Sequence, residues 1–179
     1  VRGDRRIFSD VNFSLTPGDW LQVTGANGSG KTSLLRILCG LLSPAEGQVF
    51  WQGANIHSLG EEYSTQMTYL GHRPSVKDEL TATENLCVAA GLSGIDIDKK
   101  TAQETLKKMG LAGRDSLPAR MLSEGQRRRV SLSRLLVCNS RLWLLDEILT
   151  SLDAAAVSLV RSLIEEHLSG GGIAVVATH

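Results

Sequence analysis

The chain has 179 residues, which is enough for one domain or for one domain with an inserted subdomain. Its hydrophobic fraction of 42% and charged fraction of 21% are those of an ordinary globular protein and exclude a disordered chain. Lys plus Arg and Asp plus Glu each number 19, so the chain lacks the overall positive charge that gathers nucleic acid or anionic lipid.

The apolar pattern predicts strands that alternate with helices. Alternating apolar residues over 11–15 indicate a half-exposed strand, and a turn at residues 17–19 leads into a second strand over 20–23. The further elements that we expect are a helix over 31–41, strands over 48–51, 67–70 and 142–145, a helix over 154–168 and a strand over 173–177. Continuous apolar strands joined by crossover helices predict an α/β fold with a mostly parallel sheet and antiparallel N-terminal strands.

Residues 80–139 have no strand pattern and predict a helical subdomain inserted into a core formed by residues 1–79 and 140–179. The helices that we expect there cover 82–90, 99–109 and 124–137. We also expect the core to be truncated at both ends, because the chain starts close to a strand and stops directly after another.

Two of these helix starts carry the S/T-x-x-E/Q spacing of a capping box. The pairs are Thr81 with Glu84 and Ser123 with Gln126. In such a box the hydroxyl of the first residue accepts a hydrogen bond from the backbone N–H three residues later. The side chain of that later residue accepts a hydrogen bond from the backbone N–H of the first. The spacing therefore predicts helix starts near residues 82 and 124.

A glycine-rich run follows the strand over 20–23 and opens the next helix. It reads Gly25, Ala26, Asn27, Gly28, Ser29, Gly30, Lys31 and Thr32, with Ser33 next. This is the P-loop pattern G-x-x-x-x-G-K-[ST] in its usual context, which disfavours a plain glycine turn. Backbone N–H groups and the helix dipole should bind phosphate, so we expect all nine residues to contact ATP. Lys31 should meet the β- and γ-phosphates, and Thr32 should bind Mg²⁺.

Two acids, Asp146 and Glu147, stand at the end of the apolar strand over 142–145, where a Walker B motif has its acids. Parallel strands end at one edge of a sheet, so this pair should lie near the phosphate loop. We expect Asp146 to bind Mg²⁺ through water and Glu147 to deprotonate the attacking water. The alternative, an acidic turn, is weakened by the presence of the P-loop.

The segment Leu122-Ser123-Glu124-Gly125-Gln126 resembles the LSGGQ signature of ATP-binding-cassette ATPases, with Glu124 where Gly or Ala is usual. The resemblance implies the P-loop NTPase (RecA-like) fold and a head-to-tail homodimer that sandwiches nucleotide. Ser123, Gly125 and Gln126 would then contact ATP held by the other copy. The alternative is that Ser123 serves only as a helix N-cap.

The same resemblance extends from Arg2 to the last residue. Residues 151–153 resemble the D-loop between subunits, which assigns Asp153 to the nucleotide interface, and His179 resembles the switch histidine that contacts the γ-phosphate. Two positions depart from the family pattern. Ile148 stands where Pro is usual, and Arg2 stands where an aromatic ring commonly stacks on adenine.

A third departure is His72, which occupies the position of a glutamine that reaches Mg²⁺ and the attacking water in the family. His72 is therefore a candidate metal ligand, although Mg²⁺ prefers oxygen and a surface imidazole is the alternative. Residues 69–72, Lys77 and residues 80–86 closely resemble the ATP-binding subunit of the haem exporter of cytochrome c biogenesis.

That closer resemblance implies an ATPase that drives haem export or haem-chaperone release from the cytoplasmic face of the inner membrane. No apolar run approaches the roughly 20 residues that span a bilayer, so we expect a peripheral protein. Integral membrane subunits would dock on the helical subdomain.

Two other functions are open. An ABC transporter ATPase for another substrate would share the nucleotide motifs but would normally carry glutamine in place of His72. A non-transport ABC protein of the ribosome or nucleic acid would usually have two cassettes and a basic surface. The one basic run is Arg127, Arg128 and Arg129, for which we favour solvated or phosphate-facing roles, so we expect no nucleic-acid partner.

Overall fold

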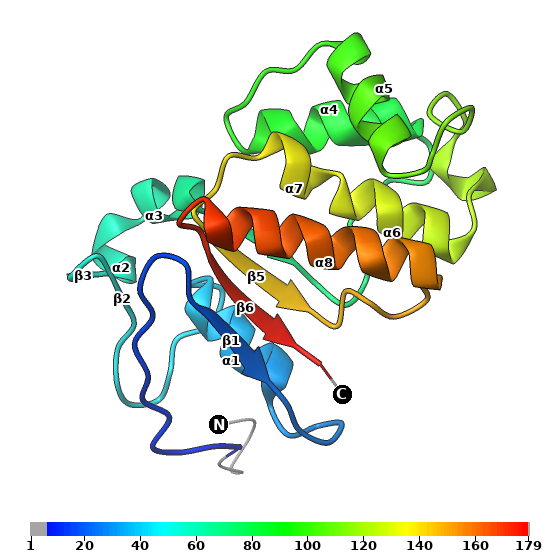
Figure 1. Ribbon diagram of the computed structural model, residues 1–179. Helices are drawn as coiled ribbons and strands as arrows, with labels where there is room; N and C mark the ends of the chain where they lie inside the picture. The colour runs from blue at the N-terminus through cyan, green and yellow to red at the C-terminus, as the bar shows by residue number, and fades with distance from the viewer. Residues whose placement is uncertain (1–6, 179) are drawn as a thin grey trace.

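The computed structural model describes residues 7–178 of the chain. The strands are β1 Trp20–Val23, β2 Phe50–Trp51, β3 Ala54–Asn55, β4 Met67–Leu70, β5 Leu142–Asp146 and β6 Ile173–Ala177. The helices are α1 Lys31–Leu38, α2 Ile56–Leu59, α3 Glu61–Gln66, α4 Ala82–Leu92, α5 Lys99–Lys108, the 3-10 helix η1 Ala119–Met121, α6 Glu124–Leu132, α7 Arg134–Val137 and α8 Ala154–Ser169. The order is labelled in Figure 1.

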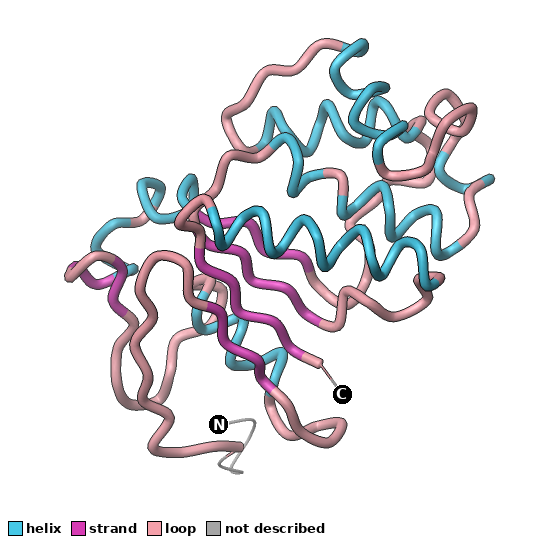
Figure 2. The backbone as a smooth tube through the Cα atoms, viewed as in Figure 1, coloured by secondary structure: helices cyan, strands magenta, loops and turns pink. Residues whose placement is uncertain are grey.

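The central sheet has the strand order β1-β6-β5-β4, and all of its neighbouring strands are parallel (Figure 2). Asp146 at the end of β5 lies opposite Ala177 at the end of β6. The expected mostly parallel sheet is therefore confirmed. Because all four strands run the same way, their carboxyl ends share one edge, at which loops from distant parts of the sequence meet.

Helices cover both faces of this sheet, as the runs of continuously buried residues in β5 and β6 require. Leu144 and Val175 belong to the apolar cluster of α1 on one face. Trp143, Leu145 and Val176 belong to the cluster of α8 on the other face.

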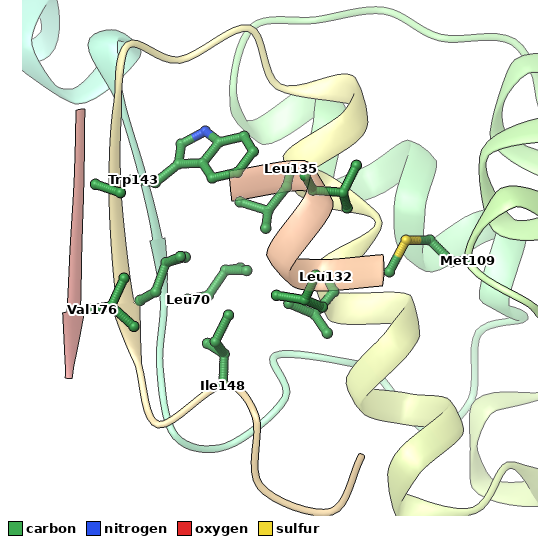
Figure 3. Close-up of a cluster of buried hydrophobic side chains, with 11 residues drawn as sticks. Leu70, Met109, Leu132, Leu135, Trp143, Ile148 and Val176 are labelled. Atoms are coloured by element: carbon green, nitrogen blue, oxygen red, sulfur yellow. The ribbon is translucent and has the colours of Figure 1, made fainter. Parts of the chain in front are cut away.

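The second cluster also joins the helical segment to the sheet (Figure 3). Leu132 and Leu135 of α6 and α7 point toward Leu70 and Trp143, and Ile148 lies below them. Ile148 is fully buried, so the residue that departs from the family's proline fills part of the core. Residues 80–139, all of which the structure describes, contribute helices and no strand.

The expected strand over 11–15 is wrong, because these residues form no strand. Val11 and Phe13 are exposed, and within the described part of the chain no strand pairs with them. Alternation alone does not make a strand, since the backbone also needs a neighbour to accept its hydrogen bonds. The antiparallel strands of this protein are instead β2 and β3.

One predicted helix is shorter in the structure, and another is divided into two. The helix from residue 31 stops at Leu38, because Gly40 takes a left-handed φ of 74° and the chain turns back on Arg36. The helix over 124–137 divides at Ser133, whose hydroxyl donates to the Arg129 carbonyl at 2.9 Å and disturbs the regular ladder. Both capping boxes are present as predicted.

Candidate active site

The phosphate loop joins β1 to α1 at the carboxyl edge of the sheet. Gly30 precedes α1 with a φ of 104°, and no side chain caps the helix. A Cβ atom at Gly30 would come within 2.5 Å of Ile7 and 2.9 Å of Phe8, so only glycine fits. The uncapped first turn leaves backbone N–H groups to bind an anion.

Lys31 is buried beneath this loop. Its Nζ donates to the carbonyl oxygens of Gly25 at 2.6 Å and Ala26 at 3.3 Å, and it lies 3.6 Å from Oε1 of Glu147. The amine is therefore held between the loop and the acid that follows β5. The remaining residues of the predicted phosphate-binding set are the exposed Asn27, Gly28 and Ser29 and the half-buried Thr32 and Ser33.

Asp146 is the last residue of β5 and has 0% of its surface exposed. Neither carboxylate oxygen has a hydrogen-bond partner among the residues that the structure describes. Burying a carboxylate without a partner costs several kcal/mol, at about the scale measured for uncompensated charges. Such a group points to a cation or a donor that arrives with the ligand.

Glu147 follows with a φ of 53°, which is uncommon for a residue other than glycine. Its carboxylate lies between two groups: Lys31 at Oε1, and the Nδ1 atom of His72 at 3.2 Å from Oε2. His72 belongs to the loop that follows β4, the strand beside β5. The parallel sheet thus brings together three predicted site residues that are far apart in sequence.

The signature residues lie elsewhere in the same chain. Figure 1 shows the N-terminus of α6 well apart from the loop between β1 and α1. Ser123 is the N-cap of α6: its Oγ accepts from the Gln126 backbone at 3.3 Å, and the Gln126 Oε1 atom accepts from the Ser123 backbone at 3.0 Å. A Cβ atom at Gly125 would lie 2.9 Å from the Ser151 carbonyl oxygen, so the signature packs tightly on residues 151–153.

Two charged contacts strengthen this junction. Oε1 of Glu124 accepts a hydrogen bond from the Ser151 hydroxyl at 3.1 Å. Asp153 caps α8 by accepting from the Ala156 backbone at 2.8 Å, and its other oxygen pairs with Arg129. The acid that departs from the signature therefore has a partner within its own chain. Arg2 and His179 lie outside the described residues.

The interpretation of the arginine run as solvated or phosphate-facing is wrong for Arg128, whereas Arg127 and Arg129 are partly exposed and paired within the chain. Arg127 pairs with Asp78 at 2.9 Å, and Arg129 pairs with Asp153. Arg128 is only 3% exposed and donates to backbone carbonyls. Helical spacing could have revealed this burial, since Arg128 lies four residues before the buried Leu132 on the same helix face.

The residues present fit a magnesium ion bound together with nucleotide. Thr32 and Asp146 offer the oxygen ligands that Mg²⁺ prefers, and neither carboxylate oxygen of Asp146 has a hydrogen-bond partner among residues 7–178. Within residues 7–178 no group of three or more His, Cys, Asp and Glu side chains could hold a metal unaided. Phosphate oxygens and water usually complete the coordination of Mg²⁺ in such sites.

The fold, the phosphate loop and the acidic pair at the end of β5 together define a P-loop nucleotide-binding domain. The profile of the ABC transporter family matches residues 8–150. The chain belongs to this family, as the signature motif predicts.

Relatives in this family resemble the chain over its whole length. It is 59% identical to the cytochrome c biogenesis ATP-binding export protein CcmA of Nitrosospira multiformis, over 100% of this chain and 87% of the relative. The protein of the same name from Nitrosomonas europaea is 52% identical, over 100% of this chain and 84% of the relative. The closer resemblance predicted from residues 69–86 is thereby confirmed.

Solved structures agree on the fold. A putative ABC transporter ATP-binding protein from Pyrococcus furiosus superposes with a TM-score of 0.86 at 23% identity, over 98% of this chain and 86% of that chain. A dimeric post-hydrolysis state of an ATP-binding cassette, bound to ADP and Pi, gives a TM-score of 0.84 at 25% identity, over 97% and 80%. No helix in the described part of this chain is long and apolar enough to cross a membrane.

Proposed function

We propose that this chain is the ATP-hydrolysing subunit of an ABC complex that drives haem export, or release of a haem chaperone, during maturation of c-type cytochromes. The observation that carries the enzymatic part is that Lys31, Glu147 and the buried Asp146 meet at one edge of the sheet, where the Asp146 carboxylate has no hydrogen-bond partner in the described part of the chain. The names of the relatives at 52% and 59% identity support the cytochrome c part.

In this proposal Lys31 exchanges its loop carbonyls for the β- and γ-phosphates of ATP, with residues 25–33 forming the phosphate cradle. Glu147 orients the attacking water and accepts its proton. Mg²⁺, held by Thr32 and through water by Asp146, would neutralise charge on the phosphates. His72 acts on Glu147 rather than on the metal, because imidazole is a poor ligand for Mg²⁺ and its Nδ1 atom already faces the carboxylate.

The signature supports a dimeric working state. Since Ser123, Gly125 and Gln126 lie apart from the phosphate loop of their own chain, they would serve ATP held by a second copy in a head-to-tail homodimer. Asp153 would lie at the same interface, and His179 would contact the γ-phosphate. A similar ATP-binding cassette, in a post-hydrolysis state bound to ADP and Pi, is dimeric.

The division into a core of residues 1–79 and 140–179 and a helical subdomain of residues 80–139 is part of the proposal. Integral membrane subunits would dock on that subdomain and hold the chain at the cytoplasmic face of the inner membrane. A nucleic-acid role is disfavoured, because the side chains of the single arginine run are occupied by Asp78, Asp153 and backbone carbonyls.

The enzymatic proposal is tested by two substitutions at the site. Lys31→Ala should abolish MgATP binding, whereas Glu147→Gln should keep binding and lower turnover by about 10²- to 10⁴-fold, as expected for loss of a general base. Equilibrium binding of a fluorescent ATP analogue and release of phosphate are the two measurements. Lys100→Ala, at an exposed lysine of α5, is the control. Equal loss of binding in both site variants contradicts the assigned roles.

The substrate proposal needs a separate experiment. The full-length protein is purified from detergent-solubilised membranes, and the copurifying proteins and any haem are identified. We expect integral membrane proteins in stoichiometric amounts together with haem. Copurification of a transporter for an unrelated solute, without haem, would contradict the cytochrome c assignment while leaving the ATPase assignment intact.

A further inference from the structure

Arg128 connects two parts of the molecule that are far apart in sequence. It lies in α6, yet its Nη1 atom donates to the Gly71 carbonyl oxygen at 3.0 Å and its Nη2 atom donates to the His72 carbonyl oxygen. Gly71 and His72 form the loop that leaves β4 for the helical segment. One guanidinium therefore donates hydrogen bonds to two consecutive peptide carbonyls of this loop.

This arginine is not an ordinary surface cation. Its side chain is buried, and burial lowers the pKa of Arg128, while the negative charges of Glu124 and Asp146 act in the opposite direction. Among residues 7–178 no carboxylate forms an ion pair with it. A buried guanidinium needs hydrogen bonds to offset desolvation, and here the loop carbonyls accept from Nη1 and Nη2, whereas Nε has no partner among the described residues. The position of the loop and the position of Arg128 are thus mutually dependent.

The loop matters because of what His72 does at its other end. The imidazole Nδ1 lies 3.2 Å from Oε2 of Glu147, although 56% of the His72 side chain is exposed. Packing therefore does little to hold the imidazole ring, and the orientation of the ring depends on the position of the His72 backbone. Arg128 binds the carbonyl oxygen of that same residue.

The N-terminal end of α6 carries the signature, and Arg128 lies in the middle of this helix. Glu124 lies four residues before Arg128, which is about one helical turn. If α6 shifts when the signature binds a nucleotide, Arg128 moves with the helix. The Gly71 and His72 peptides that are hydrogen-bonded to Arg128 would then move as well, together with the imidazole that faces Glu147. Packed side chains and hydrogen bonds that link two sites in this way can carry coupling free energy.

We infer that Arg128 is a positioning residue for ATP hydrolysis: it sets the Gly71–His72 peptides so that His72 orients Glu147, and it thereby couples the signature helix to the base. The inference rests on the proposed role of Glu147. It assigns to Arg128 an effect on the hydrolytic step and no contact with nucleotide.

The first test separates turnover from binding. Arg128→Gln and Arg128→Lys are compared with Arg127→Gln, which removes a neighbouring arginine of the same helix whose contacts are Asp78 and the Ala119 carbonyl. We expect both Arg128 variants to lower kcat by about tenfold, equal to about 1.4 kcal/mol on the barrier. Their Kd for MgATP should stay within about twofold, and kcat of Arg127→Gln should stay close to that of the wild type.

A double-mutant cycle with His72→Ala tests the route. If Arg128 acts through His72, the double variant should lose no more kcat than His72→Ala alone. The inference is overturned if the losses in kcat of the two single variants multiply in the double variant. It is also overturned if Arg127→Gln lowers kcat as much as the Arg128 variants do. Turnover by Glu147→Gln at the wild-type rate would instead refute the proposed base, so the two failures are distinguishable.

Folding is measured on every variant by circular dichroism and thermal unfolding, because the shorter side chain of Arg128→Gln cannot donate to both of the part-buried carbonyl oxygens. Arg128→Lys keeps the charge and a donor group but loses the planar fork of the guanidinium, and it is the milder change. If both Arg128 variants are unfolded at the assay temperature, the residue is structural and the inference is overturned. In a folded variant, faster hydrogen exchange confined to residues 71–73 supports the inference.

Discussion

Asp146→Asn should make the ligand-free protein more stable while weakening its response to MgATP. In the structure the Asp146 carboxylate is 0% exposed and both of its oxygens lack partners among the described residues. A buried charge left without a partner costs several kcal/mol, whereas a buried amide costs about 1–3 kcal/mol. Favourable interaction of this carboxylate with Arg128 offsets part of the difference. We therefore expect a gain of about 2 kcal/mol in the free energy of unfolding.

For a chain of this length, that gain corresponds to a rise in Tm of about 4–8 °C. Thermal unfolding is followed by tryptophan fluorescence without nucleotide and then with MgATP at about 100 times Kd, where binding adds about 2.7 kcal/mol to the wild type. Asp146→Asn should gain much less from MgATP. Asp96→Asn, at an exposed position, is the control and should change neither value. A lower Tm for Asp146→Asn than for the wild type in the absence of nucleotide would refute the reasoning.

Three further predictions concern the shared site, the metal and the pH. Chains carrying Ser123→Arg or Lys31→Ala should each be inactive, but mixing them should restore one of two sites, whereas no recovery would show that copies do not share sites. His72→Ala should change the Mg²⁺ dependence of ATP affinity by less than about tenfold, and a larger loss would make His72 a ligand. The half-buried His167 ring stacks on Trp143 with 3.8 Å between centroids, and burial lowers its pKa from the usual 6.5. As the pH falls, His167 is therefore protonated in the unfolded chain before it is protonated in the folded chain. The contribution of neutral His167 to the free energy of unfolding is complete above pH 6.5 and decreases as the pH drops below that value. Urea unfolding at several pH values should show this decrease in the wild type and a smaller one in His167→Gln.

Features that depend on neighbouring residues could be predicted from the amino-acid sequence alone. The phosphate loop, the capping boxes at Thr81 and Ser123 and the continuous apolar strand before Asp146 follow from contacts within a few residues, and the structure has these elements where the pattern predicts them. Strand order could be inferred in part, because crossover helices require parallel neighbours and bring strand ends to one edge. On that basis His72, Glu147 and the phosphate loop could be predicted to lie close together.

Which groups become partners across long stretches of sequence depends on how the chain packs. Residues 11–15 have the alternation of a strand, but no neighbouring strand in the described chain pairs with them. From its residue type Arg128 would be expected at the surface. Packing of α6 against the loop after β4 instead buries its side chain, which donates hydrogen bonds to two carbonyl oxygens of that loop. The physical reason is that a hydrogen bond or an ion pair needs both partners within about 3 Å. Spacing along the chain sets that distance within a helical turn, whereas only the packed fold sets it between Arg128 and His72, or between His72 and Glu147.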